Sequence, residues 1–382
     1  MDETAQKQSE KIDSDMHSAP VPPQPDNSGN SSKKNNTKMY ALFGIGVVVV
    51  LLVIFIGVTQ YFKASLNSAS SSQTQKNIEP VEKITIGVSD AVPELSALLY
   101  IAAKNKYFED AGLDAVLKKE LNGLVAQKEV LDGKIDVATT PAFAIVSDGF
   151  EHNNFRILAS IGRGDIIEII GRRDKNITKP ADLKGKRVGF TPKSTAEFFL
   201  GRFLTLNNLT FADIIPVSMG FDKIPQALEN GQIDAAASIN LFSYPIKQKM
   251  GENVVSWSAQ RGQDIFWLLV STKDFTTNHP QTVKKLLKAV IKAEEYLKKN
   301  PTEGKAIIMN RLHLDQAYFN QIWPKNKFGV SLDQELLIAM EDQARWRIEN
   351  KLTDKAKVPN YLDFIYLDGL KNVKPEAVSI IK

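Results

Sequence analysis

The chain has 382 residues and a net charge of +4, with Lys and Arg scattered along it, so a nucleic-acid surface is not indicated. It contains no cysteine, which excludes disulfides, zinc thiolates, cysteine nucleophiles, iron–sulfur clusters and a cysteine-linked lipid anchor. Its four histidines lie far apart and lack metal-ligand spacing, so we predict no metal and no other cofactor.

The N-terminal segment is polar. Residues 1–38 are rich in Ser, Asn, Pro, Gln and Lys and have almost no aromatic residues. Such a composition cannot bury enough apolar surface to offset the entropy lost on ordering. We expect a disordered cytoplasmic tail.

An apolar run follows at residues 41–58 and carries no charge. As a helix it is long enough to cross the hydrocarbon core of a membrane, and Tyr40 and Tyr61 suit the two interfaces. Three lysines closely precede the run and one follows, which places the N-terminus in the cytoplasm. The alternative is a cleaved signal peptide, but the run and the preceding tail are long for one. We therefore predict an uncleaved anchor at 39–62 in the cytoplasmic (inner) membrane, with the chain that follows it in the periplasm or outside the cell.

Residues 63–81 form a polar linker, and hydrophobic patterns typical of strands and helices begin at residue 82. The predicted strands of the first part are 83–88, 113–117, 135–139 and 155–161. The predicted helices between them are 95–106, 124–131 and 143–147. This alternation predicts right-handed crossovers and a parallel sheet.

The same alternation recurs further along the chain. The predicted strands are 166–170, 186–191, 214–218 and 233–239, and the predicted helices are 194–206 and 222–230. The apolar strand 266–271 is well placed to cross back to the sheet formed by the first set of strands. Helices then follow at 283–299 and 332–352, with a final packing segment at 373–381. We assign 82–165 and 266–382 to lobe 1 with its C-terminal helices, and 166–265 to lobe 2.

One short stretch occurs twice and relates the two lobes. Residues 132–138 are Asp-Gly-Lys-Ile-Asp-Val-Ala, and residues 230–236 are Asn-Gly-Gln-Ile-Asp-Ala-Ala. In each copy a glycine, Gly133 or Gly231, stands where the end of a helix needs a left-handed residue. Chance is one explanation, and two α/β lobes with one plan is the other. The repeated Asp136 and Asp234 lie at strand starts, where we expect a structural role.

Ligands of open α/β sheets bind outside the carboxyl ends of the strands. The two repeat strands end at Thr139-Thr140-Pro141 and at Ser238-Ile239-Asn240. Facing lobes would bring these ends to one cleft. We therefore place Thr139, Thr140, Pro141, Ile239 and Asn240 among the candidate ligand-binding residues, although two threonines before a proline also suit a helix cap.

The predicted helix at 194–206 supplies the strongest candidate. Ser194 and Glu197 have the spacing of a capping box, in which Ser194 accepts from the third helical amide. Free N–H groups and the positive end of a helix dipole favour an anion. We therefore expect Ser194, the Thr195 hydroxyl and the amides of Thr195 and Ala196 to contact an anionic group, in addition to the plain capping role.

Two charged residues have open assignments. Glu94, in the first loop, can accept from an amine of the ligand or remain a solvated loop residue. Arg163, where the lobes meet, can bind an oxyanion in a bidentate manner or pair with Asp165.

Several segments together resemble a known family. These are "KITIGVSD" and "VLDGKIDVA" in the first lobe, then "ADLKGKRVGFTPKS", "NGQIDAAAS" and "HPQTVKKLLKAVIKAEEYL" in the same order along the chain. They are similar to substrate-binding proteins of the sulfonate, taurine, nitrate and thiamine-precursor ABC importers, over nearly all of residues 82–382. The resemblance implies an α/β, two-lobed periplasmic binding protein-like fold (type II) that closes on a small ligand. Many members have Trp-Glu-Pro-Tyr after the second repeat strand, where this chain has Ile239-Asn240-Leu241-Phe242.

The sequence contains no catalytic constellation, glycine-rich phosphate loop or metal cluster that we can identify. We therefore expect a membrane-tethered, non-enzymatic solute-binding protein that passes an anionic or zwitterionic ligand to an ABC permease. Two alternatives remain open at this point: an enzyme on the same fold, either pyrimidine-forming or dehydratase-like, and a membrane-tethered ligand sensor.

Overall fold

The computed structural model describes residues 57–61, 63 and 81–381 of the chain. The predicted tail and nearly all of the predicted membrane anchor and linker lie outside the described residues. Among the residues that are described, no helix is long and apolar enough to cross a membrane. The described residues from 81 to 381 belong to one compact unit.

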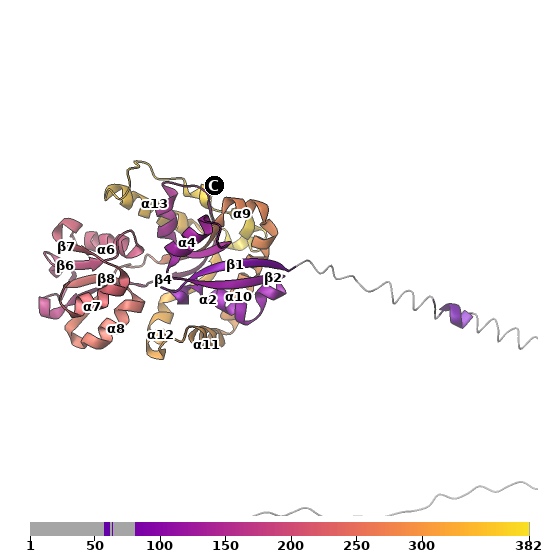
Figure 1. Cartoon of the computed structure of the whole chain (residues 1–382), viewed down its shortest axis with the longest axis horizontal. Helices are drawn as coiled ribbons and strands as arrows, with labels where there is room; N and C mark the ends of the chain where they lie inside the picture. Colours follow the sequence, from indigo (N-terminus) through magenta and orange to yellow (C-terminus); the bar gives the residue numbers. More distant parts are fainter. Residues whose placement is uncertain (1–56, 62, 64–80, 382) are drawn as a thin grey trace, which may run out of the picture. The chain divides into compact units, whose positions relative to one another are not determined.

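Two mixed sheets form the frame of this unit (Figure 1). The larger sheet has the strand order β11-β4-β10-β3-β1-β2. Its strands are β1 (Glu82–Ser89), β2 (Leu113–Glu120), β3 (Val137–Pro141), β4 (Phe155–Gly164), β10 (Ile265–Thr272) and β11 (Asn326–Ser331). The smaller sheet has the order β7-β6-β8-β5-β9. Its strands are β5 (Ile167–Arg172), β6 (Arg187–Phe190), β7 (Ile215–Ser218), β8 (Ala235–Ile239) and β9 (Val254–Ser258). The expected α/β fold with two sheets is confirmed.

The predicted parallel pairing is confirmed for β1, β2 and β3 and for β6, β7 and β8, but both sheets also contain antiparallel strands. Strands β1, β2 and β3 are parallel, but β10 lies between β3 and β4 and is antiparallel to both. All residues of β10 except the last are buried, as expected for a central strand covered on both faces. In the smaller sheet β5 is likewise antiparallel to its neighbour β8. Each of these two strands, β5 and β10, comes directly after a connection between the lobes.

Helices cover both sheets. In the larger lobe, Figure 1 shows α4 on one side of the sheet and α2 and α10 on the other. The helices of the larger lobe are α2 (Ala97–Lys104), α3 (Tyr107–Asp110), α4 (Gly123–Leu131), α5 (Ala142–Gly149), α9 (Lys273–Asn278), α10 (Pro280–Lys299), α11 (Pro301–Leu312), α12 (Gln316–Ile322), α13 (Gln334–Glu349) and α14 (Leu367–Lys371). Those of the smaller lobe are α6 (Thr195–Leu206), α7 (Ile224–Glu229) and α8 (Asn240–Met250). Helix α8 and the antiparallel strands β9 and β11 were not predicted from the sequence.

The repeated sequence makes the same contacts in both lobes. The Asp136 carboxylate accepts from the Thr85 amide at 2.7 Å, and the Asp136 amide donates to the Thr85 carbonyl at 3.0 Å. The Asp234 carboxylate accepts from the Arg187 amide at 2.9 Å, and its amide returns a bond of 2.8 Å. Each aspartate thus joins the start of one strand to its neighbour, a structural role.

The glycines and isoleucines of the repeat also correspond. Gly133 and Gly231 have φ of 68° and 70°, the left-handed geometry predicted for them. In the neighbouring strands, a Cβ on Gly87 would lie 2.5 Å from the Ile135 side chain, and one on Gly189 would lie 2.6 Å from Ile233. The two lobes therefore use one local plan.

The lobes are joined where β4 leads to β5 and where β9 leads to β10. Gln260, fully buried on the second connection, binds the first: its side-chain amide donates to the Gly164 carbonyl at 2.8 Å. Its carbonyl oxygen accepts from the amides of Ile166 and Ile167 at 2.6 and 2.9 Å. Asp165 accepts from the Ser258 hydroxyl at 2.9 Å, and burial raises the pKa of this carboxyl above its ordinary value. These bonds hold the two connections together as one hinge.

Candidate functional site

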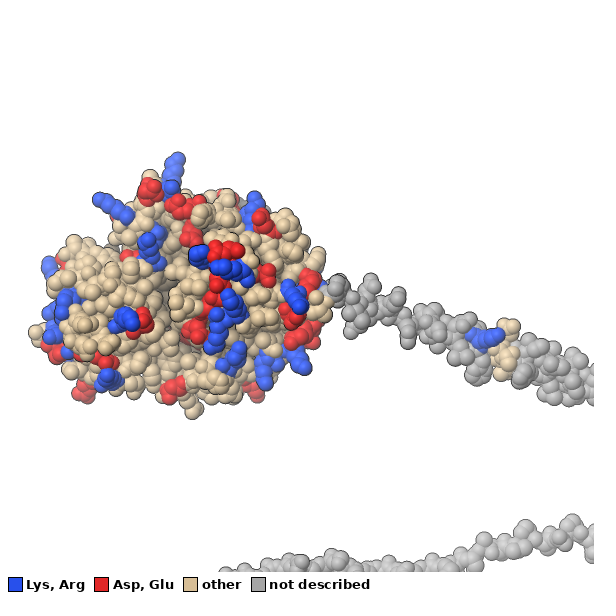
Figure 2. Space-filling view, viewed as in Figure 1, with Lys and Arg blue, Asp and Glu red and all other residues tan. Residues whose placement is uncertain are grey.

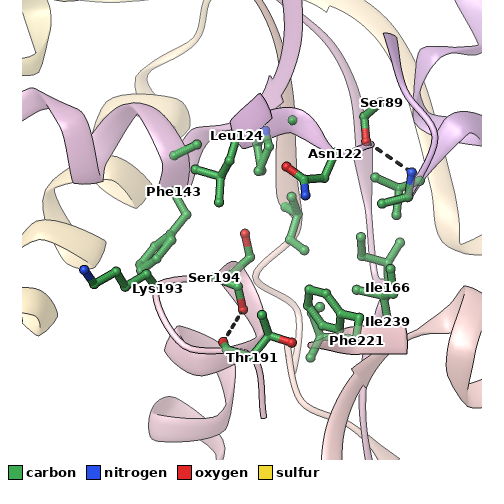
Figure 3. Close-up of a pocket in the computed structure, with 18 of the residues that line it drawn as sticks. Ser89, Asn122, Leu124, Phe143, Ile166, Thr191, Lys193, Ser194, Phe221 and Ile239 are labelled. Carbon is green, nitrogen blue, oxygen red and sulfur yellow. Dashed lines mark hydrogen bonds between the residues drawn. The ribbon is translucent and has the colours of Figure 1, made fainter. Parts of the chain in front are cut away.

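A cavity of about 500 Å³ lies between the two lobes (Figure 3). Residues of both sheets line it, mostly where strands end and helices begin. The lining also includes Ile166, on the first connection, and Ile167, Ile265 and Trp267, in the strands to which the two connections lead. This position is where open α/β sheets bind ligands.

Equivalent strand ends of the two lobes meet at the cavity. Ser89 follows Gly87 by two residues at the end of β1, and Thr191 follows Gly189 by two residues just after β6; both line the cavity. Pro141 at the end of β3 and Ile239 at the end of β8 form a second matched pair in the lining. The structural correspondence between the two lobes therefore includes residues that line the cavity.

The N-terminus of α6 opens on the cavity, where Ser194 and Thr195 both contribute to the lining. The Ser194 hydroxyl accepts from the Ala196 amide at 3.2 Å and donates to the Thr191 carbonyl at 2.7 Å (Figure 3). The predicted capping box is wrong in detail, because Ser194 caps the second helical amide instead of the third. Glu197 accepts from the Lys193 amide at 2.7 Å, one residue before the cap.

Two features of this turn, whose residues line the cavity, bear on ligand binding. The Thr191 hydroxyl oxygen is buried and has no hydrogen-bond partner among the described residues. Lys193, beside it, has a left-handed backbone with φ of 57°, which non-glycine residues rarely adopt except where the surroundings impose it. The first amides of a helix also have no partner within the helix. The Thr195 amide and the Thr191 hydroxyl are therefore donors suited to a bound oxyanion.

A second helix start, at α4, contributes from the larger lobe. The Asn122 side chain caps α4 by accepting from the Val125 amide at 3.0 Å. A Cβ on Gly123 would lie 2.7 Å from the Pro141 ring and 3.0 Å from Thr140 Cα. Glycine at this position therefore allows α4 to begin directly against the end of β3.

The other predicted strand-end residues lie behind the lining. Thr139 and Thr140 are fully buried: the Thr139 hydroxyl accepts from the Ser89 amide at 3.2 Å, and the Thr140 hydroxyl donates to Gln127 at 3.1 Å. Ala196 is buried, and its amide is taken by Ser194. Asn240 is buried and donates to the Asp165 carbonyl at 3.4 Å, on the hinge side.

Glu94 does not line the cavity and is only 2% exposed, so it is not a solvated loop residue. It lies in a short 3₁₀ turn, Pro93–Ser96, between β1 and α2. Burial raises the pKa of its carboxyl to about 7. The Glu94 carboxyl is therefore a titratable group buried in the larger lobe.

Arg163 also lies outside the cavity lining, and its predicted partner is wrong. Its guanidinium binds the carboxylates of Asp333 and Glu335 at the start of α13, not Asp165. It also stacks over the Phe266 ring, 4.4 Å from the centroid. In this geometry Arg163 anchors the start of helix α13 to strand β4.

Most of the apolar residues that line the cavity were not predicted from the sequence. Phe143, Phe221, Phe242 and Trp267 all face the cavity, as do leucines 121 and 124. The signal that could have found several of them was the strand-end rule applied to every strand, because residues 121–124 follow β2 and residues 220–222 follow β7.

The described residues include no cluster of three or more His, Asp or Glu side chains that could hold a metal ion. On the face shown in Figure 2, acidic and basic side chains are interspersed. This surface has no basic patch of the kind that binds nucleic acid.

The fold and the cavity together define the class of protein to which this chain belongs. Two α/β lobes joined by paired connecting segments, with a cavity between strand ends, make up a solute-binding protein fold of the periplasmic type. A family model described as "NMT1/THI5 like" matches residues 95–304, and the chain belongs to this family.

Individual relatives are distant. The chain is 20% identical over 281 residues to the formylaminopyrimidine-binding protein of Halalkalibacterium halodurans, covering 72% of this chain and 83% of the relative. It is 24% identical over 207 residues to the taurine-binding periplasmic protein of Escherichia coli, covering 52% and 62%.

Solved structures share the fold. The alkanesulfonate-binding protein SsuA from Xanthomonas axonopodis pv. citri bound to MOPS superposes with a TM-score of 0.63 at 18% identity, covering 75% of this chain and 99% of that one. The periplasmic aliphatic sulphonate-binding protein SsuA from Escherichia coli gives 0.61 at 16% identity, covering 74% and 99%.

Proposed function

We propose that this protein captures a small organic anion between its two lobes outside the cytoplasm and delivers it to an ABC permease. The observation that carries the proposal is that α6 begins at the inter-lobe cavity, with the Thr195 amide and the unpartnered Thr191 hydroxyl on its wall. A helix N-terminus stabilises a nearby anion by about 0.3–1 kcal/mol, and by up to about 2 kcal/mol when partly buried. The names of the sulfonate- and taurine-binding relatives support the same ligand chemistry.

The mechanism is hinge closure. Ligand enters between the open lobes, and the lobes rotate about the connections that Gln260 and Asp165 hold together. Closure brings the start of α6 against residues 122–124 of the larger lobe and removes the ligand from water. The permease then recognises the closed form.

Stabilisation by ligand tests this function. An anion at 100 times its dissociation constant should raise the free energy of unfolding by about 2.7 kcal/mol. Thermal melting of the full-length chain should therefore shift upward with organic sulfonates or carboxylates. A Thr191→Val variant, which lacks the proposed hydroxyl donor, should need higher ligand concentrations for the same shift.

The matched control is Thr205→Val, at the exposed far end of α6. It should respond to ligand like the parent. Shifts that are absent for all organic anions, or equal in the Thr191→Val variant and the parent, would argue against binding at the start of α6.

The proposal includes a membrane anchor at residues 39–62. It rests on the charge-free run at 41–58 and the lysines that precede it. Protease added outside spheroplasts should degrade the binding domain. Complete protection of that domain would reverse the proposed orientation.

A further inference from the structure

The two lobes also touch outside the cavity, where helix α8 of the smaller lobe lies beside helix α12 of the larger lobe (Figure 1). The rings of Tyr244 on α8 and Tyr318 on α12 have centroids 5.0 Å apart. The Tyr244 hydroxyl also donates to the carboxylate of Asp315, which caps α12, at 3.3 Å. These contacts therefore join the two lobes at a place separate from the two connections.

A buried carboxylate makes another contact between the lobes outside the cavity. Glu168, on β5 of the smaller lobe, is only 6% exposed. One of its oxygens binds Lys247 of the same lobe at 2.6 Å, and the other accepts from Lys325 of the larger lobe at 3.1 Å. The Lys325 carbonyl accepts from the Asp165 amide at 3.2 Å, so Lys325 lies directly against the first connection. The ion pair between Lys325 and Glu168 thus crosses from one lobe to the other beside the hinge.

These contacts lie behind the hinge, on the side away from the cavity. In the larger sheet, β11 and β2 are the opposite edges, and β4 and β10 at the two connections lie toward the β11 edge. Lys325 directly precedes β11, whereas Leu121 of the cavity lining directly follows β2. On α8, Phe242 lines the cavity, and Tyr244 lies about 200° further around the helix and does not line it. The hinge therefore stands between the cavity and the contacts of Tyr244 and Lys325.

A rotation that brings two lobes together in front of a hinge moves their surfaces apart behind it. In this structure the contacts behind the hinge are formed while Leu121, at the cavity, is still 75% exposed. Closure of the cavity must therefore separate Tyr244 from Tyr318 and Lys325 from Glu168.

We propose that these two contacts form a rear latch, which holds the lobes open and sets the affinity for ligand from outside the cavity. A ligand that binds the closed form must supply the free energy needed to break the latch, so its apparent affinity falls by the fraction of molecules that are closed without ligand. This inference rests on the hinge closure of the proposed function and adds residues that control it.

The test uses the absence of cysteine from the chain. Spin labels on Lys119→Cys and Lys223→Cys, both at exposed positions within two residues of the cavity lining, report the distance between the lobes at the cavity by double electron–electron resonance. In the full-length chain without ligand, Tyr244→Ala should increase the closed, short-distance population about two- to tenfold, the value of one aromatic pair. Calorimetric titration should show affinity for 1-hexanesulfonate raised by a similar factor.

Two further variants separate the latch from a general loss of packing. Lys325→Gln, which leaves Glu168 paired with Lys247, should shift the distances in the same direction as Tyr244→Ala. The matched control is Tyr296→Ala, which removes one ring of the Tyr107–Tyr296 pair inside the larger lobe. It should leave both the distances and the affinity unchanged.

The outcomes distinguish the latch from the function on which it rests. Identical distance distributions in the parent and in both latch variants, or a shift toward longer distances, would overturn the latch. The distances are measured without ligand, so a shift to shorter distances supports the latch even where 1-hexanesulfonate binds to none of the proteins. That absence of binding would count against anion capture alone.

Discussion

At the scale of single residues, Glu94 gives the protein a calculable pH dependence. Burial raises the pKa of its carboxyl from 4.5 to about 7 in the folded protein. The folded protein therefore binds this proton more tightly than the unfolded chain does. The stability that the protonated group contributes is fully present below pH 4.5 and is lost as the pH rises through about 7.

Replacing Glu94 by Gln should remove this dependence. Between pH 4.5 and 8, the parent should lose roughly 3 kcal/mol of unfolding free energy relative to Glu94→Gln. Urea unfolding at a series of pH values measures the difference. Parallel pH profiles for the two proteins would show that Glu94 is ionised at no cost in the folded state.

Residues differ in how far their roles can be predicted from sequence. The Ser194 cap and the left-handed Gly133 and Gly231 depend on contacts within a few residues, and the local pattern indicated them. Arg163 pairs with Asp333, which is 170 residues away, and no local pattern specifies that partner.

At the scale of elements, helix α13 of the larger lobe contacts helix α6 of the smaller lobe through Trp346. Trp346 packs edge-on against Phe198 of α6, with centroids 5.3 Å apart, and lies 6.3 Å from Phe143 of α5. A Cβ on Gly201 of α6 would lie 2.7 Å from the Trp346 ring. Glycine at 201 therefore lets α6 approach α13 closely, beside the cavity that Phe143 lines.

A larger side chain at Gly201 should disrupt this contact. Gly201→Val should lower the free energy of unfolding by about 1–3 kcal/mol because it overpacks the interface. In the Trp346→Ala background the same substitution should cost less, since the obstructing ring is gone. A double-mutant cycle in urea measures the coupling, and additive effects would contradict the proposed contact.

The order of the strands in each sheet could not be predicted from the hydrophobic pattern. The pattern located most strands, but direction and neighbours depend on which distant segment inserts between them. Strand β10 enters between β3 and β4 because its residues are apolar on both faces and suit the most buried position. Strands β9 and β11 were missed because each lies at a sheet edge and is only partly buried.

At the scale of the whole molecule, the internal repeat was the most informative part of the sequence. It indicated two lobes on one plan, and the matched pairs Ser89–Thr191 and Pro141–Ile239 extend that plan to the cavity. The apolar character of the cavity was not predictable in this way. Its walls combine side chains such as Leu121, Phe242 and Trp267 from segments that meet only in the folded chain.

The most direct measurement of the central claim is a crystal structure of the binding domain with 1-hexanesulfonate. Our account predicts sulfonate oxygens within hydrogen-bond distance, about 2.7–3.2 Å, of the Thr195 amide and the Thr191 hydroxyl. The alkyl chain should lie against Phe221 and Phe242, with the two lobes closed around it. A sulfonate bound outside the cavity, or bound inside it with its oxygens directed away from α6, would contradict the account.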